Sequence, residues 1–412
     1  MGPRILLVTT MNWPSSARLA GAFAGVGAHV EALFPPGHVK GKSRFVHGRH
    51  HYSALFPQAS LVSAIARAAP DLIVPCDDRA LALLRAQQAQ APRSAPAELI
   101  ARSLGNTQSY RTLIARSDFI AAARAAGIVA PQTVPVANEQ VLEAELSRLG
   151  YPAVLKSDGS WGGEGVAIVR NFEAALKAFR KFSLASSRAR NLARTVSRRD
   201  AHFLRDAISP PHVAISLQRF VAGAPATTAF ACWKGRVLAT IHMDVLESLG
   251  STGPASVMRR TDCPQMEKAA VLLAERFGLS GLHGLDFVRD GAGQPHLIEI
   301  NPRATQASAF ALGPGHDLAA ALAGCVSPCA GGARPAATKN PVIALFPQEW
   351  RRNPKSDWLH TAYQDVPWDD PAVLRACLEP GEPTPERRPE ALEQAHTTLV
   401  YATQEVAPPT PH

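Results

Sequence analysis

Residues able to bind a metal ion cluster around a short turn near residue 290. Asp286 precedes the turn Asp290-Gly-Ala-Gly293, and Glu299 and Asn301 follow it. Alternating side chains on both sides of such a turn predict a β-hairpin. Because side chains alternate between the two faces of a strand, Glu299 and Asn301 project to the same side. Two carboxylates and an amide oxygen are the hard ligands that Mg²⁺ takes beside phosphate groups.

The pairing register of this hairpin decides whether the three side chains meet. If Asp286 lies opposite Glu299, Asp286 shares the polar face with Glu299 and Asn301. The other face then carries only apolar side chains, those of Phe287, Ile298 and Ile300. We therefore expect Asp286, Glu299 and Asn301 to be metal ligands, and Arg303, on the same strand face, to bind an anionic group beside the metal. The alternative is a solvated strand face with incidental acidic residues.

A second candidate combines a lysine with a glycine-rich loop. Lys156 ends an apolar strand and is followed by Ser157-Asp-Gly-Ser-Trp-Gly-Gly-Glu-Gly165 and a return strand at residues 166–169. Glycines let backbone N–H groups converge on an anion, which the lysine ammonium would neutralise. The loop is not a Walker A loop, because Gly-Lys-Ser/Thr and the following helix are absent. A phosphate is therefore the expected ligand, and an ordinary hairpin with turn glycines is the alternative.

Strands and helices alternate in the first hundred residues. Apolar strands are expected at residues 4–10, 29–34 and 71–75, and helices at 19–26 and 61–69. This alternation predicts a parallel sheet whose ligand edge lies at the carboxyl ends of the strands. Thr9, Thr10, Asp77 and Asp78 fall at that edge. No Gly-x-Gly-x-x-Gly follows the first strand, so we expect no nicotinamide site.

The remaining elements are expected to surround the two candidate sites. Helices are predicted at residues 109–116 and 119–126, a strand at 151–156, and a helix with a basic loop at 172–206. Residues 215–301 are rich in strands, with one helix at about 265–277. One apolar strand at residues 342–346 follows, and a helix opens at Asp370-Pro371, since Pro is favoured at the first helical position.

Composition excludes several classes of protein. The chain has 412 residues, six Cys and 46% hydrophobic residues, which predicts two or three packed units rather than disorder. No apolar run approaches the roughly 18–20 residues that span a bilayer, and residues 1–8 lead into a strand rather than a signal peptide. The cysteines are scattered without a zinc-type spacing, which is typical of reduced cytosolic thiols. We therefore expect a cytoplasmic protein with no membrane partner.

The excess positive charge is concentrated in one segment. The formal net charge is +9, and residues 177–206 contain nine Lys or Arg against two acidic residues. A basic excess can indicate nucleic acid, an anionic membrane or a phosphate-rich substrate. Because the segment follows the candidate phosphate loop, we expect a solvated loop there, with an anionic substrate or partner as the alternative.

Taken in order, these motifs resemble those of the ATP-grasp superfamily, specifically its carboxylate–amine ligases and its carbamoyl-phosphate-synthetase-like branch. The resemblance covers most of the chain and implies an α/β fold class, with α+β structure in the grasp. Residues 1–105 would form a Rossmann-like pre-ATP-grasp domain and residues 106–330 a two-lobed ATP-grasp domain. The lid would span about 130–216 and the metal-binding lobe about 217–330. Residues 331–412 would form a small C-terminal α/β extension with a flexible tail.

The resemblance also implies a role for each matching residue. Asp286, Glu299 and Asn301 match the magnesium ligands, and Arg303 and Lys156 would act in catalysis. The residues that would bind ATP are Arg116, Lys156, Ser157, Gly159, Gly162, Gly163, Gly165 and the hinge residues Gln218, Arg219, Phe220 and Val221. The residues that would line the acceptor pocket are Ser256, Arg259 and Arg260, and the alternative is a turn with a solvated pair of arginines. One departure is Ala224-Pro-Ala226, where related enzymes usually carry an acid that grips the ribose.

The reaction implied by the resemblance uses ATP with Mg²⁺, or Mn²⁺ in its place. A substrate carboxylate would attack the γ-phosphate to give an acyl phosphate and ADP, and an amine would displace phosphate. The partners are then a small-molecule carboxylate and amine rather than nucleic acid or a membrane, and a homo-oligomer is compatible. One alternative is a bicarbonate- or carbamate-activating enzyme. The other is a non-catalytic nucleotide- or nucleic-acid-binding protein, favoured by the absent ribose acid and the basic segment.

Overall fold

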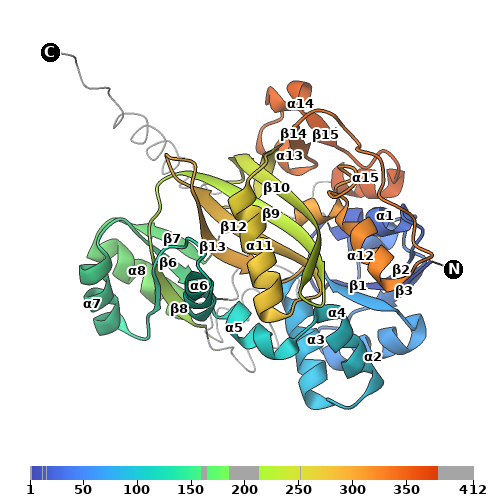
Figure 1. Ribbon diagram of the computed structural model, residues 1–412, viewed down its shortest axis with the longest axis horizontal. Helices are drawn as coiled ribbons and strands as arrows, with labels where there is room; N and C mark the ends of the chain where they lie inside the picture. Colours follow the sequence, from blue (N-terminus) through green and yellow to red (C-terminus); the bar gives the residue numbers. More distant parts are fainter. Residues whose placement is uncertain are drawn as a thin grey trace.

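The computed structural model describes residues 2–11, 13–14, 16–158, 165–184, 213–250 and 252–378. The first sheet is parallel and has the strand order β3-β2-β1-β4 (Figure 1). Its strands are β1 (Arg4–Val8), β2 (His29–Phe34), β3 (Gly48–His51) and β4 (Leu72–Pro75). The helices of this region are α1 (Ser16–Ala24), α2 (Pro57–Ala68), α3 (Asp78–Gln90) and α4 (Ala95–Leu104), with a short 3₁₀ turn η1 (Val39–Lys42). The expected parallel sheet with helical crossovers is therefore confirmed.

A small antiparallel sheet follows, with the strand order β5-β8-β6-β7. Its strands are β5 (Thr133–Pro135), β6 (Ala153–Ser157), β7 (Val166–Val169) and β8 (Ile215–Arg219). Leu155 and Leu217 project from one face and are buried against α7 (Glu139–Leu149) and α8 (Phe172–Ser183). Because side chains alternate, Lys156 and Gln218 belong to the opposite face.

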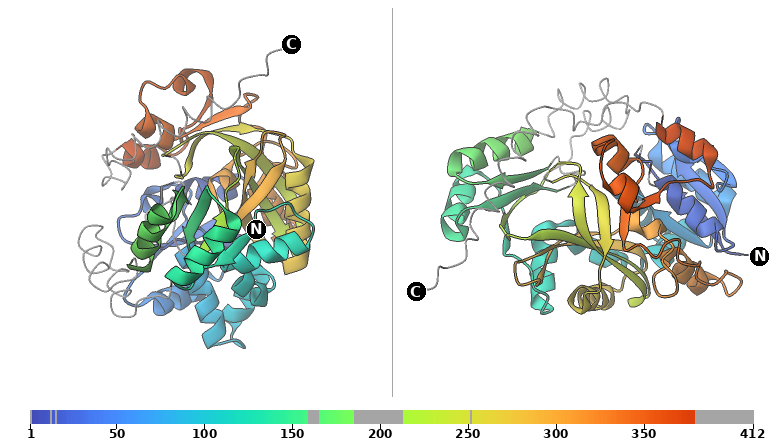
Figure 2. Two further views of the ribbon diagram at one scale, coloured as in Figure 1. Left: turned by 90° about the vertical axis from the view of Figure 1, so that its left-hand side faces the viewer. Right: turned by 90° about the horizontal axis from the view of Figure 1, so that it is seen from above.

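The largest sheet has seven strands in the order β13-β12-β9-β10-β11-β14-β15. These strands are β9 (Ala224–Trp233), β10 (Arg236–Ser248), β11 (Ala255–Arg260), β12 (Gly281–Arg289), β13 (Pro295–Asn301), β14 (Val342–Leu345) and β15 (Tyr363–Asp365). One face packs on α11 (Pro264–Phe277), and the other on α12 (Leu318–Val326) and the 3₁₀ turn η4 (Gln306–Ala309). Figure 2 shows this sheet lying between the small sheet and the N-terminal sheet.

Short helices connect and complete these sheets. The turn η2 (Thr107–Ser109), α5 (Tyr110–Ile114) and α6 (Arg116–Ala125) lead from the N-terminal sheet to the small sheet. The helices α13 (Gln348–Arg352), α14 (Trp358–Thr361) and α15 (Pro371–Leu378) complete the C-terminal part. The strands β14 and β15 extend the large sheet, so this part continues the sheet that carries the candidate metal ligands. The domain boundaries expected from the sequence remain a prediction.

Backbone contacts fix the N-terminal sheet against the large sheet. Ala304 N donates to Pro75 O at 3.1 Å, and Gly105 forms a bridge with Leu279. Gly105 has a φ of +84°, and a Cβ there would lie 2.1 Å from Gly278 O, so only glycine allows this approach. No helix in the described ranges is long and apolar enough to cross a membrane. All six cysteines are described, and none forms a disulfide.

Candidate functional site

The hairpin of β12 and β13 has the register that the alternation predicted. Asp286 lies opposite Glu299 and Gly284 lies opposite Asn301, so Asp286, Glu299 and Asn301 share one face of the sheet. Asn301 Nδ2 donates to Asp286 Oδ2 at 2.8 Å. The structure therefore brings the three expected metal ligands together.

The apolar face of this hairpin differs from the expectation at one residue. The register shifts after the Asp286–Glu299 pair, so that Phe287 lies opposite Leu297 and Ile298 has no opposite residue. Such a β-bulge re-aims the residues around the extra one. Leu297 and Ile300 are buried in the core with Phe287, whereas Ile298 is only partly buried. The prediction that Ile298 shares this apolar face was wrong, because a regular alternation was assumed through the bulge.

Arg116, the first residue of α6, connects the small sheet to the β12–β13 hairpin, which carries the expected metal ligands. Its guanidinium donates to Glu299 Oε1 at 2.8 Å, to Ser157 O at 2.7 Å and to Asp158 Oδ1 at 3.1 Å. Burial alone would raise the pKa of Glu299, but the Arg116 and Lys156 charges outweigh it and lower that pKa. Arg116 Nε is buried and has no partner among the described residues. A buried donor without an acceptor is the feature expected of a group that receives an anion.

Lys156 lies at the end of β6 and reaches across to the bulge. Its Nζ donates to Ile298 O at 3.4 Å, and the side chain is almost fully buried. Burial lowers the pKa of Lys156 to about 8, with Arg116 adding to the decrease and Glu299 opposing it. The neighbouring Ser216 lies opposite Lys156 in the sheet, and its buried Oγ has no partner among the described residues. This face therefore offers an ammonium and a free hydroxyl to a ligand.

The hinge residue Gln218 lies on the same face of the small sheet as Lys156. Its Nε2 donates to Thr133 Oγ1 at 2.9 Å and to Ile298 O at 3.5 Å. The partly exposed Val154 and Ile168 pair with each other beside it and belong to this face. Of the other expected hinge residues, Arg219 is exposed, and Phe220 and Val221 are partly buried. This face thus presents an apolar surface next to polar groups, as a nucleotide base requires.

Arg303 joins the β12–β13 hairpin to the N-terminal sheet. It donates through Nη2 to Asn301 Oδ1 at 3.1 Å and through Nε to Asp78 Oδ1 at 3.0 Å. Asp78 follows the carboxyl end of β4, the edge at which the sequence placed the ligand side, and its side chain remains 42% exposed. Asp77 instead caps α3 by accepting from Ala80 N at 2.8 Å. Sequence reasoning placed Asp78 at the ligand edge but did not assign it to the site, although its position after a buried strand was the available signal.

The three expected metal ligands, Asp286, Glu299 and Asn301, form a triad, and its two carboxylates repel each other. Burial and the adjacent Glu299 carboxylate raise the pKa of Asp286, and Asn301 supplies a neutral oxygen. A divalent cation would relieve that repulsion, so the donor set fits Mg²⁺. In the described part of the chain, no three His, Cys, Asp or Glu side chains gather as a metal site. The candidate contains two carboxylates and one amide, so its remaining ligands would come from water and substrate phosphates.

The structure does not bring the three expected acceptor residues together. Ser256 is fully buried and donates to Glu349 Oε2 at 2.8 Å. Arg259 pairs with Asp244 at 3.2 Å, on the sheet face opposite to Asp286. Cross-strand pairs lead from Asp286 on β12 over β9 and β10 to Arg260 on β11, so Arg260 lies on the same face of the sheet as Asp286. The fully buried Met243 lies between these two side chains.

Part of the predicted nucleotide loop lies outside the described residues. Gly159, Gly162 and Gly163 fall there, as does most of the basic segment 177–206, of which residues 185–206 are not described. The flanks are described: Ser157 N donates to Gly165 O at 2.8 Å, which closes the base of the loop. The phosphate role of these glycines remains a prediction.

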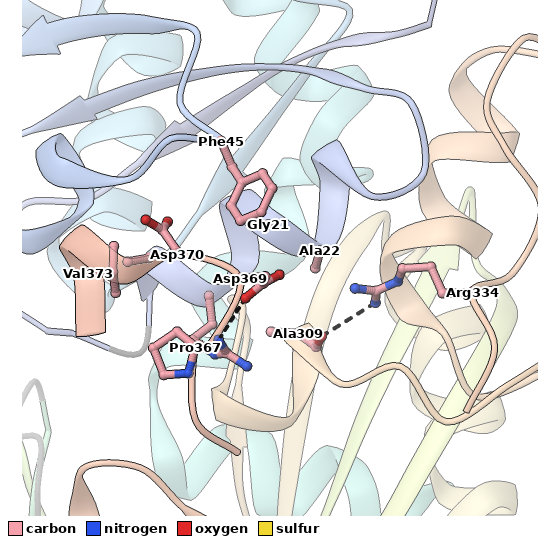
Figure 3. Close-up of a pocket in the computed structure, with 11 residues that line it drawn as sticks. Gly21, Ala22, Phe45, Ala309, Arg334, Pro367, Asp369, Asp370 and Val373 are labelled. Carbon is pink, nitrogen blue, oxygen red and sulfur yellow. Dashed lines mark hydrogen bonds and ion pairs between the residues drawn. The ribbon is translucent and has the colours of Figure 1, made fainter. Parts of the chain in front are cut away.

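A small cavity lies apart from this cluster. It has a volume of about 70 Å³ and is lined by residues of α1, the loop between η1 and β3, η4, α15 and the loop before α15, among them Arg18, Phe45, Ala309 and Asp369 (Figure 3). None of the site residues expected from the sequence lines it. The cavity belongs to the junction between α1 and the C-terminal part, not to the cluster around Glu299.

Comparison with known proteins identifies the domain that carries the cluster. The family described as ATP-grasp domain matches residues 120–307. No curated protein matches the chain. Among solved structures, the biotin carboxylase domain of Hydrogenobacter thermophilus 2-oxoglutarate carboxylase, in complex with MgADP, ADP and bicarbonate, has a TM-score of 0.56 and 14% identity. That match covers 79% of this chain and 70% of the other.

Two further structures belong to a different enzyme. N5-carboxyaminoimidazole synthetase of Staphylococcus aureus, complexed with ADP, has a TM-score of 0.56 and 13% identity, covering 81% of this chain and 79% of its own. The Aspergillus clavatus enzyme, with ADP and 5-aminoimidazole ribonucleotide, has a TM-score of 0.55 and 11% identity, covering 79% and 76%. These likenesses show a shared fold. The matching family shows that residues 120–307 of this chain form an ATP-grasp domain.

Proposed function

We propose that this chain is an ATP-dependent, Mg²⁺-requiring ligase that activates a small-molecule carboxylate as an acyl phosphate and joins it to an amine. The observation that carries the proposal is the cluster around Glu299. Three cationic side chains, Arg116, Lys156 and Arg303, surround two carboxylates and an amide where two sheets meet. Phosphoryl transfer requires mainly alignment and charge neutralisation, and this cluster supplies both.

The triad Asp286, Glu299 and Asn301 would hold the magnesium ion. Bound there, Mg²⁺ would neutralise charge on the phosphates of ATP. Arg116 now donates to Glu299 Oε1 at 2.8 Å, and release of this oxygen would leave both carboxylate oxygens of Glu299 available to the ion. We infer that Arg116 exchanges this carboxylate for a nucleotide phosphate, using the Nε that lacks a partner in the described structure.

The other residues would divide between nucleotide and substrate. Lys156 and Ser216 would contact phosphate from the small sheet, and Val154 and Ile168 would support the adenine. Gln218 Nε2 already donates to Thr133 Oγ1 and Ile298 O, so its Oε1 is the atom left to accept from a purine amino group. Arg303, held by Asp78 and Asn301, would bind the reacting carboxylate beside the transferred phosphate.

Bicarbonate is a second candidate for the activated carboxylate. It is present in the Hydrogenobacter thermophilus structure, and the N5-carboxyaminoimidazole synthetase structures share the fold. Bicarbonate-dependent formation of ADP without an organic acid would favour this candidate. The presence of all three expected metal ligands and of three cationic side chains favours an enzyme over a protein that binds nucleotide without turnover.

The proposal is tested by Glu299→Gln. Phosphate release and product mass are measured over a panel of carboxylates, amines and bicarbonate with MgATP. We expect Glu299→Gln to lower substrate-dependent ADP formation at least about 100-fold, because a carboxylate ligand of the metal is lost. The matched control is Glu143→Gln, on an exposed position of α7, which should keep full activity. Unchanged turnover in a folded Glu299→Gln protein would contradict the metal assignment.

A further inference from the structure

A lysine amine and a cysteine thiol meet at the carboxyl edge of the N-terminal sheet. Lys40 lies in the turn η1, and Cys76 directly follows β4. Lys40 Nζ donates to Cys76 Sγ at 3.6 Å and also to Thr9 Oγ1, just after β1. The two residues are 36 positions apart, so the packing of η1 against the sheet brings them into contact. The proposed ligase reaction uses neither side chain.

Within the described ranges, the amine of Lys40 is buried without a carboxylate partner. The side chain is fully buried, and its hydrogen bonds go to Thr9 and Cys76. The nearby Asp77 carboxylate instead accepts from Thr10 N at 2.7 Å and from Thr10 Oγ1 at 2.8 Å. Burial lowers the pKa of Lys40, and Cys76 and Asp77 oppose this decrease. A lower pKa leaves more of the amine unprotonated, which is the form that acts as a nucleophile.

The contact with an amine distinguishes Cys76 from the other buried cysteines of the described residues. The exposed fraction of Cys76 is 7%, against 5% for Cys263, 4% for Cys377 and 0% for Cys232. The nearest match in exposure, Cys263, donates through Sγ to Gln265 Oε1 at 3.4 Å. Because Cys76 lies at the edge of a sheet, local opening there admits a molecule as small as hydrogen peroxide. Cys76 therefore combines access for a small oxidant with a neighbouring nucleophile.

We propose that Cys76 and Lys40 form a reversible sulfenamide cross-link when the protein meets hydrogen peroxide. In the first step, the O–O bond breaks and an S–O bond forms, so that the sulfur is oxidised to a sulfenic acid and the second peroxide oxygen leaves as water. In the second step, Lys40 Nζ attacks this sulfur, an S–N bond forms and the S–O bond breaks. The hydroxide that leaves takes a proton from the nitrogen and departs as a second water.

The geometry of the pair suits the second step. The distance of 3.6 Å between Lys40 Nζ and Cys76 Sγ is close to the roughly 3–3.5 Å of a near-attack arrangement. A sulfenic acid that finds no nucleophile is oxidised further to the sulfinic acid, so the amine protects the sulfur. A thiol reductant attacks the sulfenamide sulfur and restores both side chains. Cys76 lies two residues before Asp78, which holds Arg303, so the cross-link adds a covalent tie beside the segment that positions this arginine.

The test exposes the full-length protein to hydrogen peroxide, alkylates the free thiols and analyses a tryptic digest by mass spectrometry. We expect residues 19–42 joined to residues 68–79, with the summed mass of both peptides less two hydrogen atoms. Because trypsin does not cleave after a modified lysine, a link at Lys40 leaves the bond after Lys40 uncut. A link at Lys42 would instead join residues 41–44 to residues 68–79 and would overturn the inference. A thiol reductant added before digestion should remove the joined pair.

Two controls separate the cross-link from general oxidation. Lys40→Met keeps an apolar stem and removes the amine, so the joined pair should be absent and Cys76 should appear as sulfinic acid. Cys263, with nearly the same exposure, is the internal control, and its alkylation should fall at least about fivefold less than that of Cys76.

The wild-type digest decides the question even if Lys40→Met does not fold, which thermal unfolding checks. Wild-type Cys76 recovered only as alkylated thiol or sulfinic acid, at a peroxide dose that oxidises the exposed Cys329, contradicts the cross-link. An equal loss of alkylation at Cys76 and Cys263 does so as well. The readout is a mass rather than turnover, so a negative result leaves the ligase proposal untouched.

Discussion

At the scale of single residues, the polar and charged side chains of the site form hydrogen bonds and ion pairs with one another before any ligand binds. Arg116 donates to Glu299, Asn301 to Asp286, and Arg303 to Asp78. Asp78 outweighs the cost of burial and raises the pKa of Arg303. Removing a partner that positions an arginine is therefore expected to affect substrate binding more than nucleotide binding.

Asp78→Asn tests this positioning role. We expect the KM of the carboxylate substrate to rise roughly fivefold, the equivalent of about 1 kcal/mol for one charge-assisted hydrogen bond. The affinity for MgADP should remain within about twofold, because Asp78 forms its hydrogen bond with Arg303, whereas Glu299 has a larger effect than Asp78 on the pKa of Arg116. Steady-state kinetics and ADP titrations measure the two effects. Asp118→Asn, at an exposed position of α6, is the control, and an equal KM change in both variants would contradict a positioning role.

Gln218 gives a second prediction at the residue scale. If Gln218 Oε1 accepts from the amino group of adenine, Gln218→Leu should weaken ATP binding roughly tenfold, because the contact is buried. The affinity for GTP, which carries a carbonyl at that position, should be much less affected. Competition between ATP and GTP for a fluorescent nucleotide analogue measures the ratio. A loss of ATP and GTP affinity by the same factor would assign Gln218 to the structure of the hinge instead.

At the scale of elements, α12 shows how one carboxylate supports a helix. Asp317 is buried, accepts from Ala320 N at 3.2 Å as the N-cap, and accepts from Arg334 Nε and Nη2 at 2.8 Å each. Burial alone would raise the pKa of Asp317, but the Arg334 contacts outweigh it and lower that pKa. The helix packs against β9 and β10, so its start matters for the large sheet.

Two substitutions separate the cap from the ion pair. Asp317→Asn keeps a capping oxygen and loses the charge, whereas Asp317→Ala loses both. We expect Asp317→Ala to lower the free energy of unfolding by about 1 kcal/mol more than Asp317→Asn, the usual value of an N-cap. Urea unfolding at neutral pH measures both. Equal losses would show that the cap contributes nothing here.

The same carboxylate gives a pH dependence with a defined sign. A lowered pKa in the folded state stabilises the protein at pH values above the ordinary Asp pKa. That stabilisation is lost as the pH falls through the lowered value. The difference in unfolding free energy between wild type and Asp317→Asn should therefore shrink on acidification below about pH 4, the ordinary range of an aspartate. A difference that stays constant down to strongly acidic pH would contradict the assigned ion pair.

At the scale of the whole molecule, the C-terminal part (β14 to α15) contacts both the N-terminal region and the large sheet. Its strands β14 and β15 extend the large sheet, and α15 packs on η1 and α1. Arg18 of α1 donates to Asp365 of β15 at 2.6 Å. Burial raises the pKa of Asp365, and Arg18 opposes that increase. This ion pair therefore joins residues from opposite ends of the chain.

A double-mutant cycle tests the contribution of this pair. Arg18→Gln should lower the free energy of unfolding by about 1–2 kcal/mol, because the partly buried Asp365 carboxylate loses its partner. The double variant Arg18→Gln/Asp365→Asn should be less destabilised than the sum of the two single variants. Urea unfolding followed by circular dichroism measures all four proteins. Additive losses would show that the two side chains do not stabilise each other.

Local patterns in the sequence determined the elements and the hairpin register. Apolar runs defined β1, β2 and β4, and the Asp-Pro pair marked the start of α15. Alternation on both sides of the turn at residue 290 predicted the pairing of Asp286 with Glu299, because a slip would have buried charges. These features depend on neighbours a few residues away, so a single strand or hairpin contains the necessary information.

Only the tertiary structure decided which distant groups meet. Arg116 and Glu299 are 183 residues apart, and Asp78 and Arg303 are 225 residues apart. The bulge at Ile298 and the burial of Ser256 against Glu349 also depend on segments far along the chain. Periodicity describes which face of an element is buried but not which element covers it. The sequence therefore determined the residue types and faces of the site, and the packing of three sheets determined the partners of each charge.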